Sequence, residues 1–277
     1  MQEISLPVTL AVLGAALLHA GWNALLKSSS DKQLDTVAIS VGAGIMGLAV
    51  AAWLPPPAEQ SWPWLAASTA VHILYFAFLA GAYRWGELSY AYPIMRGGGP
   101  VIVALAGTAV FGEVLPMAPT IGVALVCAGI VAFAAGRADR RATLFALANA
   151  VVIAAYTVID AKGARASGSP IAYTMWFFAG NAVAIYAYAG IRRGVEVPRY
   201  LARNWTRILI GAVLTTSSYG IALWAMTRAP VALVAVLRET SVLFAALIGA
   251  LFLGEKLTRR RLVATGAVLA GLITLRL

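Results

Sequence analysis

The sequence is poor in charge, in cysteine and in histidine. Only 12% of its 277 residues are charged and 61% are apolar, whereas about a quarter of a soluble domain is charged. The single cysteine, Cys127, lies in an apolar run, so no disulfide or cysteine-based metal site is expected. His19 and His72 are the only histidines, and no H-E-x-x-H motif or cluster of acids accompanies them. These shortages indicate a membrane protein with no metal and no bound cofactor.

The charge that is present is mostly positive. A formal net charge of +10 would suit a protein that binds nucleic acid. The basic residues, however, lie between apolar runs and form no continuous stripe, so no nucleic-acid partner is expected. The chain also lacks a GxxxxGK[ST] loop, which excludes a phosphate-binding loop for ATP as the direct energy source. No basic region or convincing cleavage site marks a signal peptide, so the first apolar run is predicted to be retained.

Long apolar runs make up most of the chain. A helix needs about 20 mostly apolar residues to cross about 30 Å of hydrocarbon, and the runs lack the alternation typical of barrel strands. We predict ten transmembrane helices, at residues 5–27, 34–54, 62–83, 88–111, 117–135, 142–162, 169–190, 207–227, 231–253 and 258–275. The loops between them are too short for a soluble catalytic domain.

Lysine and arginine are shared unequally between the two sides of these spans. If the N-terminus is outside, fifteen of the twenty-one basic residues fall in inner loops and four in outer segments. The positive-inside rule therefore places both termini outside, on the periplasmic side of a bacterial cytoplasmic membrane. The remaining two, Arg96 and Arg238, lie within spans.

The fourth and ninth spans share an unusual pattern. Shifting the sequence by 142 residues places Arg96 on Arg238 and Gly112-Glu113 on Gly254-Glu255. The twenty positions 96–115 contain seven identities in this register. Chance similarity between apolar helices is the alternative explanation.

The first helices of the two halves also match, because a shift of 134 places Trp22-Asn23 on Tyr156-Thr157. Each copy then has five helices, an odd number, so the second copy crosses the membrane in the opposite sense. We therefore predict an all-α membrane protein of two inverted five-helix repeats, residues 1–135 and 136–277, around a central cavity. This architecture is typical of carriers that work by alternating access.

The aromatic-polar pair in the first helix of each half and the Gly-Glu that ends the fourth helix of each half resemble EamA-type carriers of the drug/metabolite transporter superfamily. The resemblance covers the whole chain. It implies that helices one to four and six to nine surround the cavity, with helices five and ten to the side. YddG-type exporters of aromatic and neutral amino acids are similar members. The implied partners are a small-molecule substrate and the lipid bilayer, for a chain that is a monomer unless it forms a homodimer.

The two arginines within spans are the first functional candidates. An arginine inside a span costs at least ~2.5 kcal/mol on insertion scales and usually faces protein or water, and its guanidinium suits a carboxylate. Arg96 and Arg238 are predicted either to contact an anionic group of the substrate or to be structural, through an acid, helix carbonyls or the interface. Asp160 lies at a depth comparable to that of Arg238.

Two acids are candidates for proton coupling. Glu239 is clearly in mid-span, and because it adjoins Arg238 the two do not face each other on a helix. It is predicted either to carry a proton during transport or to lock two helices together. Asp160 lies near a helix end and is expected to be exposed to water.

Aromatic and polar residues recur on the faces of several other spans. They would suit the wall of a substrate site, or plain helix packing, and the histidines are expected either to pack or to relay protons. The predicted substrate-binding residues are His19, Trp22, Asn23, His72, Tyr75, Tyr83, Arg96, Tyr156, Thr157, Ser218, Tyr219, Trp224 and Arg238.

A glycine-rich stretch follows Arg96 in the fourth span. Pro100 removes one backbone hydrogen bond, and Gly97, Gly98 and Gly99 allow bending and close approach. The stretch is predicted to be a hinge, or else a seam of small residues where helices touch.

Composition and repeat together favour a secondary carrier, working either with proton coupling or by facilitated diffusion. The resemblance implies that it exports small metabolites such as amino acids. A lipid-carrier flippase and a nucleotide-sugar carrier of the same fold are alternatives. A membrane-embedded enzyme is disfavoured, because the spans contain no evident nucleophile–base pair or metal cluster. A receptor that moves nothing is the third class.

Overall fold

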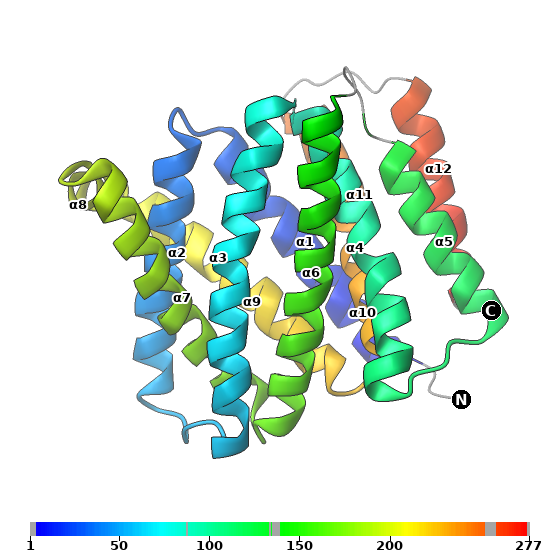
Figure 1. The fold of residues 1–277 in the computed structure, drawn as a ribbon, viewed down its shortest axis with the longest axis horizontal. Coiled ribbons are helices and arrows are strands. Elements are labelled where there is room, and N and C mark those ends of the chain that lie inside the picture. The colour runs from blue at the N-terminus through cyan, green and yellow to red at the C-terminus, as the bar shows by residue number, and fades with distance from the viewer. Residues whose placement is uncertain (1–3, 87, 133, 135–138, 253–258, 276–277) are drawn as a thin grey trace.

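The computed structural model describes residues 4–86, 88–132, 134, 139–252 and 259–275, and in these ranges the regular elements are all helices (Figure 1). They are α1 (Leu6–Lys27), α2 (Lys32–Ala51), the short η1 (Glu59–Ser61), α3 (Trp62–Trp85), α4 (Leu88–Phe111), α5 (Met117–Ala132), α6 (Arg140–Ala166), α7 (Pro170–Arg193), α8 (Glu196–Arg203), α9 (Trp205–Met226), α10 (Val231–Arg238), α11 (Ser241–Phe252) and α12 (Arg259–Thr274). The expected all-α membrane fold is confirmed.

Each predicted span contains helix, but the match is not one to one. By length and composition, seven helical stretches are long and apolar enough to cross a membrane, and α5 and α12 are apolar but shorter within the described residues. The chain is therefore a multi-pass membrane protein, and the count of ten crossings stays a prediction. α8 was not predicted, because its eight residues include three charges.

The ninth predicted span is not one continuous helix. α10 ends at Arg238, and α11 begins at Ser241. Between them the chain tightens into three-residue turns, in which Glu239 N–H donates to Val236 O (3.0 Å) and Thr240 N–H to Leu237 O (3.1 Å). The discontinuity thus places the polar residues from Glu239 to Ser241 inside the bundle, where all three are buried.

The predicted hinge in α4 is helical throughout, with Pro93 and Pro100 both inside the helix. A methyl group on Gly97 would lie 2.7 Å from Val131 Cγ2 of α5, and one on Gly99 would lie 3.0 Å from Ile153 Cγ2 of α6. The missing side chains therefore let two helices approach α4 closely, which is the seam of small residues offered as the alternative. Bending at this stretch during transport stays a prediction.

Several contacts between helices follow a scheme that is symmetric with respect to the two halves of the chain. Each of these contacts has a counterpart in which every helix is replaced by the corresponding helix of the other half. α2 packs on α7, α5 on α12 and α4 on α10, so each pair joins corresponding helices of the two halves. α3 packs on α6 as α1 packs on α9, and α4 packs on α6 as α1 packs on α11. α1 and α6, the first helices of the halves, run in opposite directions (Figure 1). Two inverted five-helix units, with α8 added to the second, would produce this scheme.

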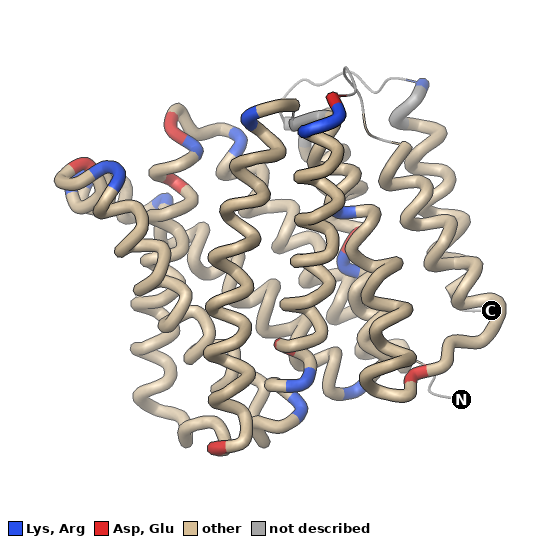
Figure 2. The backbone as a smooth tube through the Cα atoms, in the orientation of Figure 1, with Lys and Arg blue, Asp and Glu red and all other residues tan. Residues whose placement is uncertain are grey.

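One end of the bundle is fastened by a buried carboxylate. Figure 2 shows lysine and arginine gathered at the end where α1 finishes and α6 starts. There Asp35 of α2 is fully buried and accepts from Arg207 Nε of α9 (2.6 Å) and from the Tyr200 hydroxyl of α8 (3.1 Å). Arg207 also donates to Leu25 O and to Ser28 Oγ (3.0 Å) at the end of α1. Four helices are thereby joined around one acid.

The contact between α2 and α7 predicts a sharp difference between two glycines. A methyl group on Gly47 would lie 2.5 Å from the carbonyl oxygen of Met175, whereas nothing lies within 4 Å of one on Gly14. Because a backbone atom cannot rotate away, we expect Gly47→Ala to lower the unfolding free energy by about 1–3 kcal/mol. Thermal unfolding of the purified protein checks this, with Gly14→Ala as the matched control, and equal melting temperatures would contradict the close contact.

Candidate functional site

A buried ion pair joins the two halves of the chain. Arg96 Nη2 of α4 lies 2.8 Å from Glu239 Oε1, at the break between α10 and α11. The two residues are only 8% and 4% exposed. Two roles were predicted for Arg96, contact with substrate or a structural role. The structure shows the second of these, a pairing with an acid. The partner is the glutamate of the other half, and sequence spacing alone does not indicate that contact.

The ion pair leaves donor and acceptor capacity unused. Arg96 Nε and Glu239 Oε2 are buried without a hydrogen-bond partner in the part of the chain that the structure describes. Buried polar atoms are normally satisfied, so each such exception calls for an explanation. Here the atoms without a partner belong to opposite charges, one a donor and the other an acceptor.

Arg238 is placed differently from Arg96. Its guanidinium carbon lies 5.2 Å from the centre of the Tyr219 ring of α9, in cation–π contact, and the residue is half-buried. No acid among the described residues forms an ion pair with Arg238; Glu239 pairs with Arg96 instead. Arg238 is thus an intramembrane arginine whose charge has no direct counter-charge in the part of the chain that the structure describes.

Asp160 was expected to be exposed to water, and this expectation is wrong. The residue is fully buried in α6. It accepts a hydrogen bond from the Tyr173 hydroxyl of α7 (2.9 Å) and another from the Tyr219 hydroxyl of α9. Gly163, one turn further along α6, makes room for Tyr173, because a methyl group there would lie 2.3 Å from the ring. Two neutral donors therefore satisfy an acid that forms no ion pair with the described residues.

A ring cluster connects α3 to the second half. His72 of α3 lies 4.3 Å, centre to centre, from Tyr156 of α6 and 4.9 Å from Phe177 of α7. His72 Nδ1 lies 2.9 Å from Ser68 O, and because a carbonyl only accepts, Nδ1 is the protonated nitrogen in this contact. Tyr75 also faces Tyr156, at 6.0 Å. The fold thus brings together three of the residues predicted to bind substrate, His72, Tyr75 and Tyr156, and their role in binding stays a prediction.

The first helix contributes one residue to this region. His19 of α1 lies within electrostatic range of both Arg96 and Arg238. Trp22 Nε1 donates to His19 Nδ1 (3.1 Å), and Asn23 Nδ2 donates to His19 O (2.7 Å). Trp22 therefore orients the His19 ring, whereas the Asn23 amide is satisfied by the backbone of its own helix.

Four predicted residues have contacts that serve packing. Thr157 Oγ1 donates to Ile153 O of its own helix (2.7 Å), and Ser218 Oγ donates to Ala15 O of α1 (2.8 Å). Trp224 lies under the guanidinium of Arg228. The fourth, Tyr83, packs partly buried in the hydrophobic cluster of α3, α4 and α6.

Sequence reasoning missed Tyr92 and the role of Glu113. Tyr92 precedes Arg96 by one turn of α4 and lies within electrostatic range of Arg96, Glu239 and Arg238. The i, i+4 spacing to Arg96 was the signal available for it.

Glu113, noted only as part of a repeated Gly-Glu, fastens the second end of the bundle. Its Oε1 lies 2.6 Å from Arg165 Nη2 of α6, and its Oε2 accepts from Val231 N–H at the start of α10 (2.8 Å). Arg165 in turn donates to Met226 O (2.8 Å). The equivalent Gly254-Glu255 lies outside the described residues.

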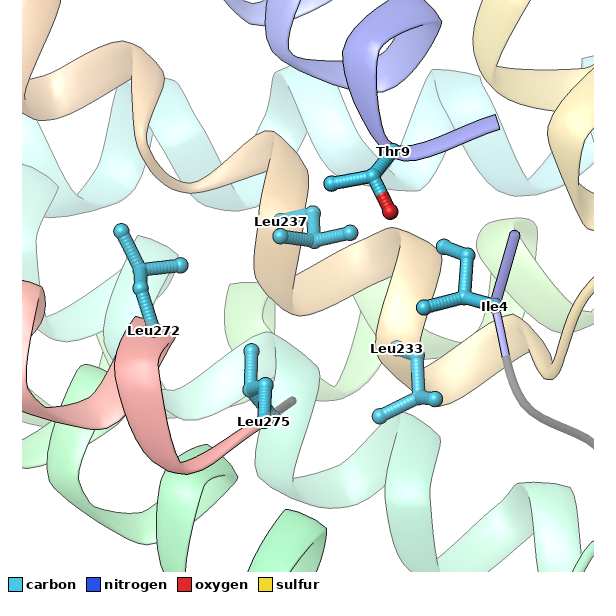
Figure 3. A pocket seen from close by; sticks show the side chains of 6 residues that line it. All are labelled: Ile4, Thr9, Leu233, Leu237, Leu272 and Leu275. Carbon is cyan, nitrogen blue, oxygen red and sulfur yellow. The ribbon is translucent and has the colours of Figure 1, made fainter. Parts of the chain in front are cut away.

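One pocket lies elsewhere in the bundle. Figure 3 shows Ile4, Thr9, Leu233, Leu237, Leu272 and Leu275 around it. Thr9 is the one polar residue that lines this pocket. The pocket shares no lining residue with the predicted substrate site. The central cavity therefore stays a prediction. No group of three metal-ligating side chains occurs among the described residues.

The Arg96–Glu239 pair predicts strongly non-additive stability. Breaking a buried pair leaves an uncompensated charge, so we expect Glu239→Gln to lower the unfolding free energy by about 3–5 kcal/mol. Replacing both partners with apolar residues, as in Arg96→Met with Glu239→Leu, is expected to recover most of this loss. Thermal or denaturant unfolding of Arg96→Met, of Glu239→Leu and of the double variant measures the coupling free energy between the two residues. Additive losses of unfolding free energy would contradict the direct pairing.

Three comparisons with known proteins bear on this geometry. The model of the EamA-like transporter family matches residues 140–277. Among 28 matching chains of solved structures is a crystal structure of a protein that aligns with 100% of this chain and 99% of its own, at a TM-score of 0.73 and 20% identity. At that identity the likeness shows a shared fold over the whole length. No protein of curated function matches the chain. Residues 140–277, the second half of the chain, thus belong to the EamA-like transporter family.

Proposed function

We propose that the chain is a secondary carrier of the bacterial cytoplasmic membrane that exports small metabolites bearing an anionic group, amino acids among them, by alternating access. Membership of a transporter family supports transport rather than catalysis. The concentration of lysine and arginine at one end (Figure 2) supports an orientation with that end in the cytoplasm and both termini in the periplasm.

The contact scheme between the halves supports the alternating-access part of the proposal. Corresponding helices meet in the pairs α2–α7, α4–α10 and α5–α12, and the first helices run in opposite directions. Inverted repeats of this kind allow one half to rock against the other around a site near the membrane midplane. The ion pair of Arg96 and Glu239 lies on the contact between α4 and α10.

The observation that carries the proposal is the unmatched charge of Arg238. An arginine inside a span is costly unless it is paired or solvated, and a bundle without a ligand would gain stability by losing it. Arg238 instead lies over Tyr219, within electrostatic range of His19, Tyr92 and Tyr156. A carboxylate bound there would neutralise Arg238, and the surrounding rings would contact an apolar body.

The unused atoms of the ion pair complete the proposed site. A substrate ammonium would donate to Glu239 Oε2, the buried oxygen without a partner. A substrate that competes for Glu239 weakens its contact with Arg96, and that contact holds α4 to α10. Binding and the movement of the halves are thereby linked. Proton coupling through Glu239 or Asp160 and facilitated diffusion both fit this arrangement.

Counterflow in proteoliposomes tests the proposal. We expect Arg238→Gln to raise the KM for carboxylate-bearing amino acids about tenfold or more, as loss of a charge-assisted bond implies, and to change flux of the corresponding amino-acid amides much less. Arg84→Gln, an exposed arginine at the end of α3, is the matched control.

Three outcomes would contradict the proposal. Equal loss for the acids and their amides would make Arg238 structural. Absence of saturable counterflow for any small anionic metabolite would remove the carrier function. Chemical alteration of the recovered substrate would indicate an enzyme.

A further inference from the structure

We propose that the outer face of α8 binds anionic phospholipid headgroups of the membrane surface, at a site separate from the transport path. The α8 basic face is defined by Arg192 at the end of α7 and by Arg199 and Arg203 of α8. This inference does not depend on which substrate the protein carries.

α8 is held firmly against the bundle by its other face. Val197 is buried and packs with Leu34 of α2 and Ala189 of α7. The Tyr200 hydroxyl donates to the buried carboxylate of Asp35 (3.1 Å). Burial, with a contribution from Asp35, raises the pKa of Tyr200, so its proton stays available for this bond. The helix is therefore a fixed part of the fold, and its outer face has a defined position.

The arginines around α8 divide into two groups. Arg193 contacts Asp31 and Glu196 (3.4 and 3.1 Å), and Arg207 contacts Asp35 (2.6 Å). The three arginines of the α8 basic face are exposed and form no ion pair with the described acids. The first group fastens the helix, and the second leaves three positive charges without a protein counter-charge.

Arg199 and Arg203 are four residues apart on the same helix, so they lie on one side of it and repel each other. Arg192 lies over the Tyr188 ring, with 5.6 Å between its guanidinium carbon and the ring centre, and is also directed outward. A bound phosphate group would relieve this repulsion through charge-assisted hydrogen bonds. The geometry thus favours an anion over an empty surface.

Apolar neighbours identify the source of that anion as lipid. Ile191, Val195 and Trp205 are 87%, 64% and 65% exposed. Ile191 adjoins Arg192, Trp205 is two residues from Arg203, and Val195 lies between Arg192 and Arg199 in sequence. Exposed apolar side chains next to basic ones, with a tryptophan, are typical of the depth where headgroups meet acyl chains. A soluble phosphate would gain nothing from these side chains, whereas a phospholipid would contact both groups. Basic clusters at this depth attract anionic lipid.

The test compares melting temperatures of the purified chain in mixed micelles that contain phosphatidylglycerol or phosphatidylcholine at equal mole fraction. We expect phosphatidylglycerol to raise the melting temperature, and the variant Arg199→Gln/Arg203→Gln to lose about half of that rise or more. In phosphatidylcholine the same variant should melt at or above the wild-type temperature, because the i, i+4 repulsion is gone.

Arg84→Gln is the matched control, since it removes one exposed charge in the last turn of α3, and α3 finishes at the end of the bundle where α6 starts (Figure 1). It should keep the full rise with phosphatidylglycerol. If the double variant cannot be purified, the single variants Arg199→Gln and Arg199→Lys are compared instead. The variant that loses the charge, Arg199→Gln, should show the smaller rise in melting temperature with phosphatidylglycerol.

Four results would overturn the proposal. They are an undiminished rise in the double variant, an equal loss in Arg84→Gln, the same rise with soluble glycerol phosphate, and a lower melting temperature of the double variant in phosphatidylcholine.

Discussion

A pair of opposite charges, buried where the two halves of an apolar bundle meet, is the constraint on which the rest of this structure depends. Arg96 and Glu239 lie 2.8 Å apart and come from segments separated by more than half of the chain. In lipid, apolar surfaces gain little by meeting each other, so helix association depends on close packing and polar contacts. The Arg96–Glu239 ion pair therefore holds the two halves together. Because removing either partner leaves a buried charge uncompensated, a charged ligand that competes for one partner would also weaken the contact between the halves.

The same principle operates at both ends of the bundle. Four acids are buried among the described residues, and each one contacts at least one helix that does not adjoin its own in sequence. Asp35 holds α2 to α8 and α9, Glu113 holds the end of α4 to α6 and α10, and Asp160 holds α6 to α7 and α9. No buried side-chain atom of these three contacts lacks a hydrogen-bond partner among the described residues. The central pair differs, since Glu239 Oε2 and Arg96 Nε have no partner there, and Arg238 beside it has only a ring. Of the buried side-chain atoms without a hydrogen-bond partner among the described residues, all but Asn149 Oδ1 thus belong to the central pair.

The helices could be predicted from sequence because each apolar run of about 20 residues has one stable solution in lipid. The importance of Arg96 and Arg238 followed from their cost in such a run. What could not be predicted were contacts between helices, which spacing along the chain does not encode. Asp160 was assigned to water because it lies near the end of its run; Tyr173, just beyond the following turn, folds over it into the space left by Gly163. α8 was not predicted because its eight residues form only about two turns of helix and include three charges, which gives too short an apolar pattern to recognise. The break at Glu239 was missed because no glycine or proline marks it.

Exchange of the two central charges tests the account most directly. Arg96→Glu and Glu239→Arg each place two like charges together inside the membrane, whereas the double variant restores one of each. The measurement is the melting temperature and the saturable counterflow of the three variants side by side. The account predicts that both single variants are severely destabilised and inactive, and that the double variant recovers a folded bundle with measurable counterflow. A double variant no more stable than the weaker single variant would contradict a direct Arg96–Glu239 contact between the halves.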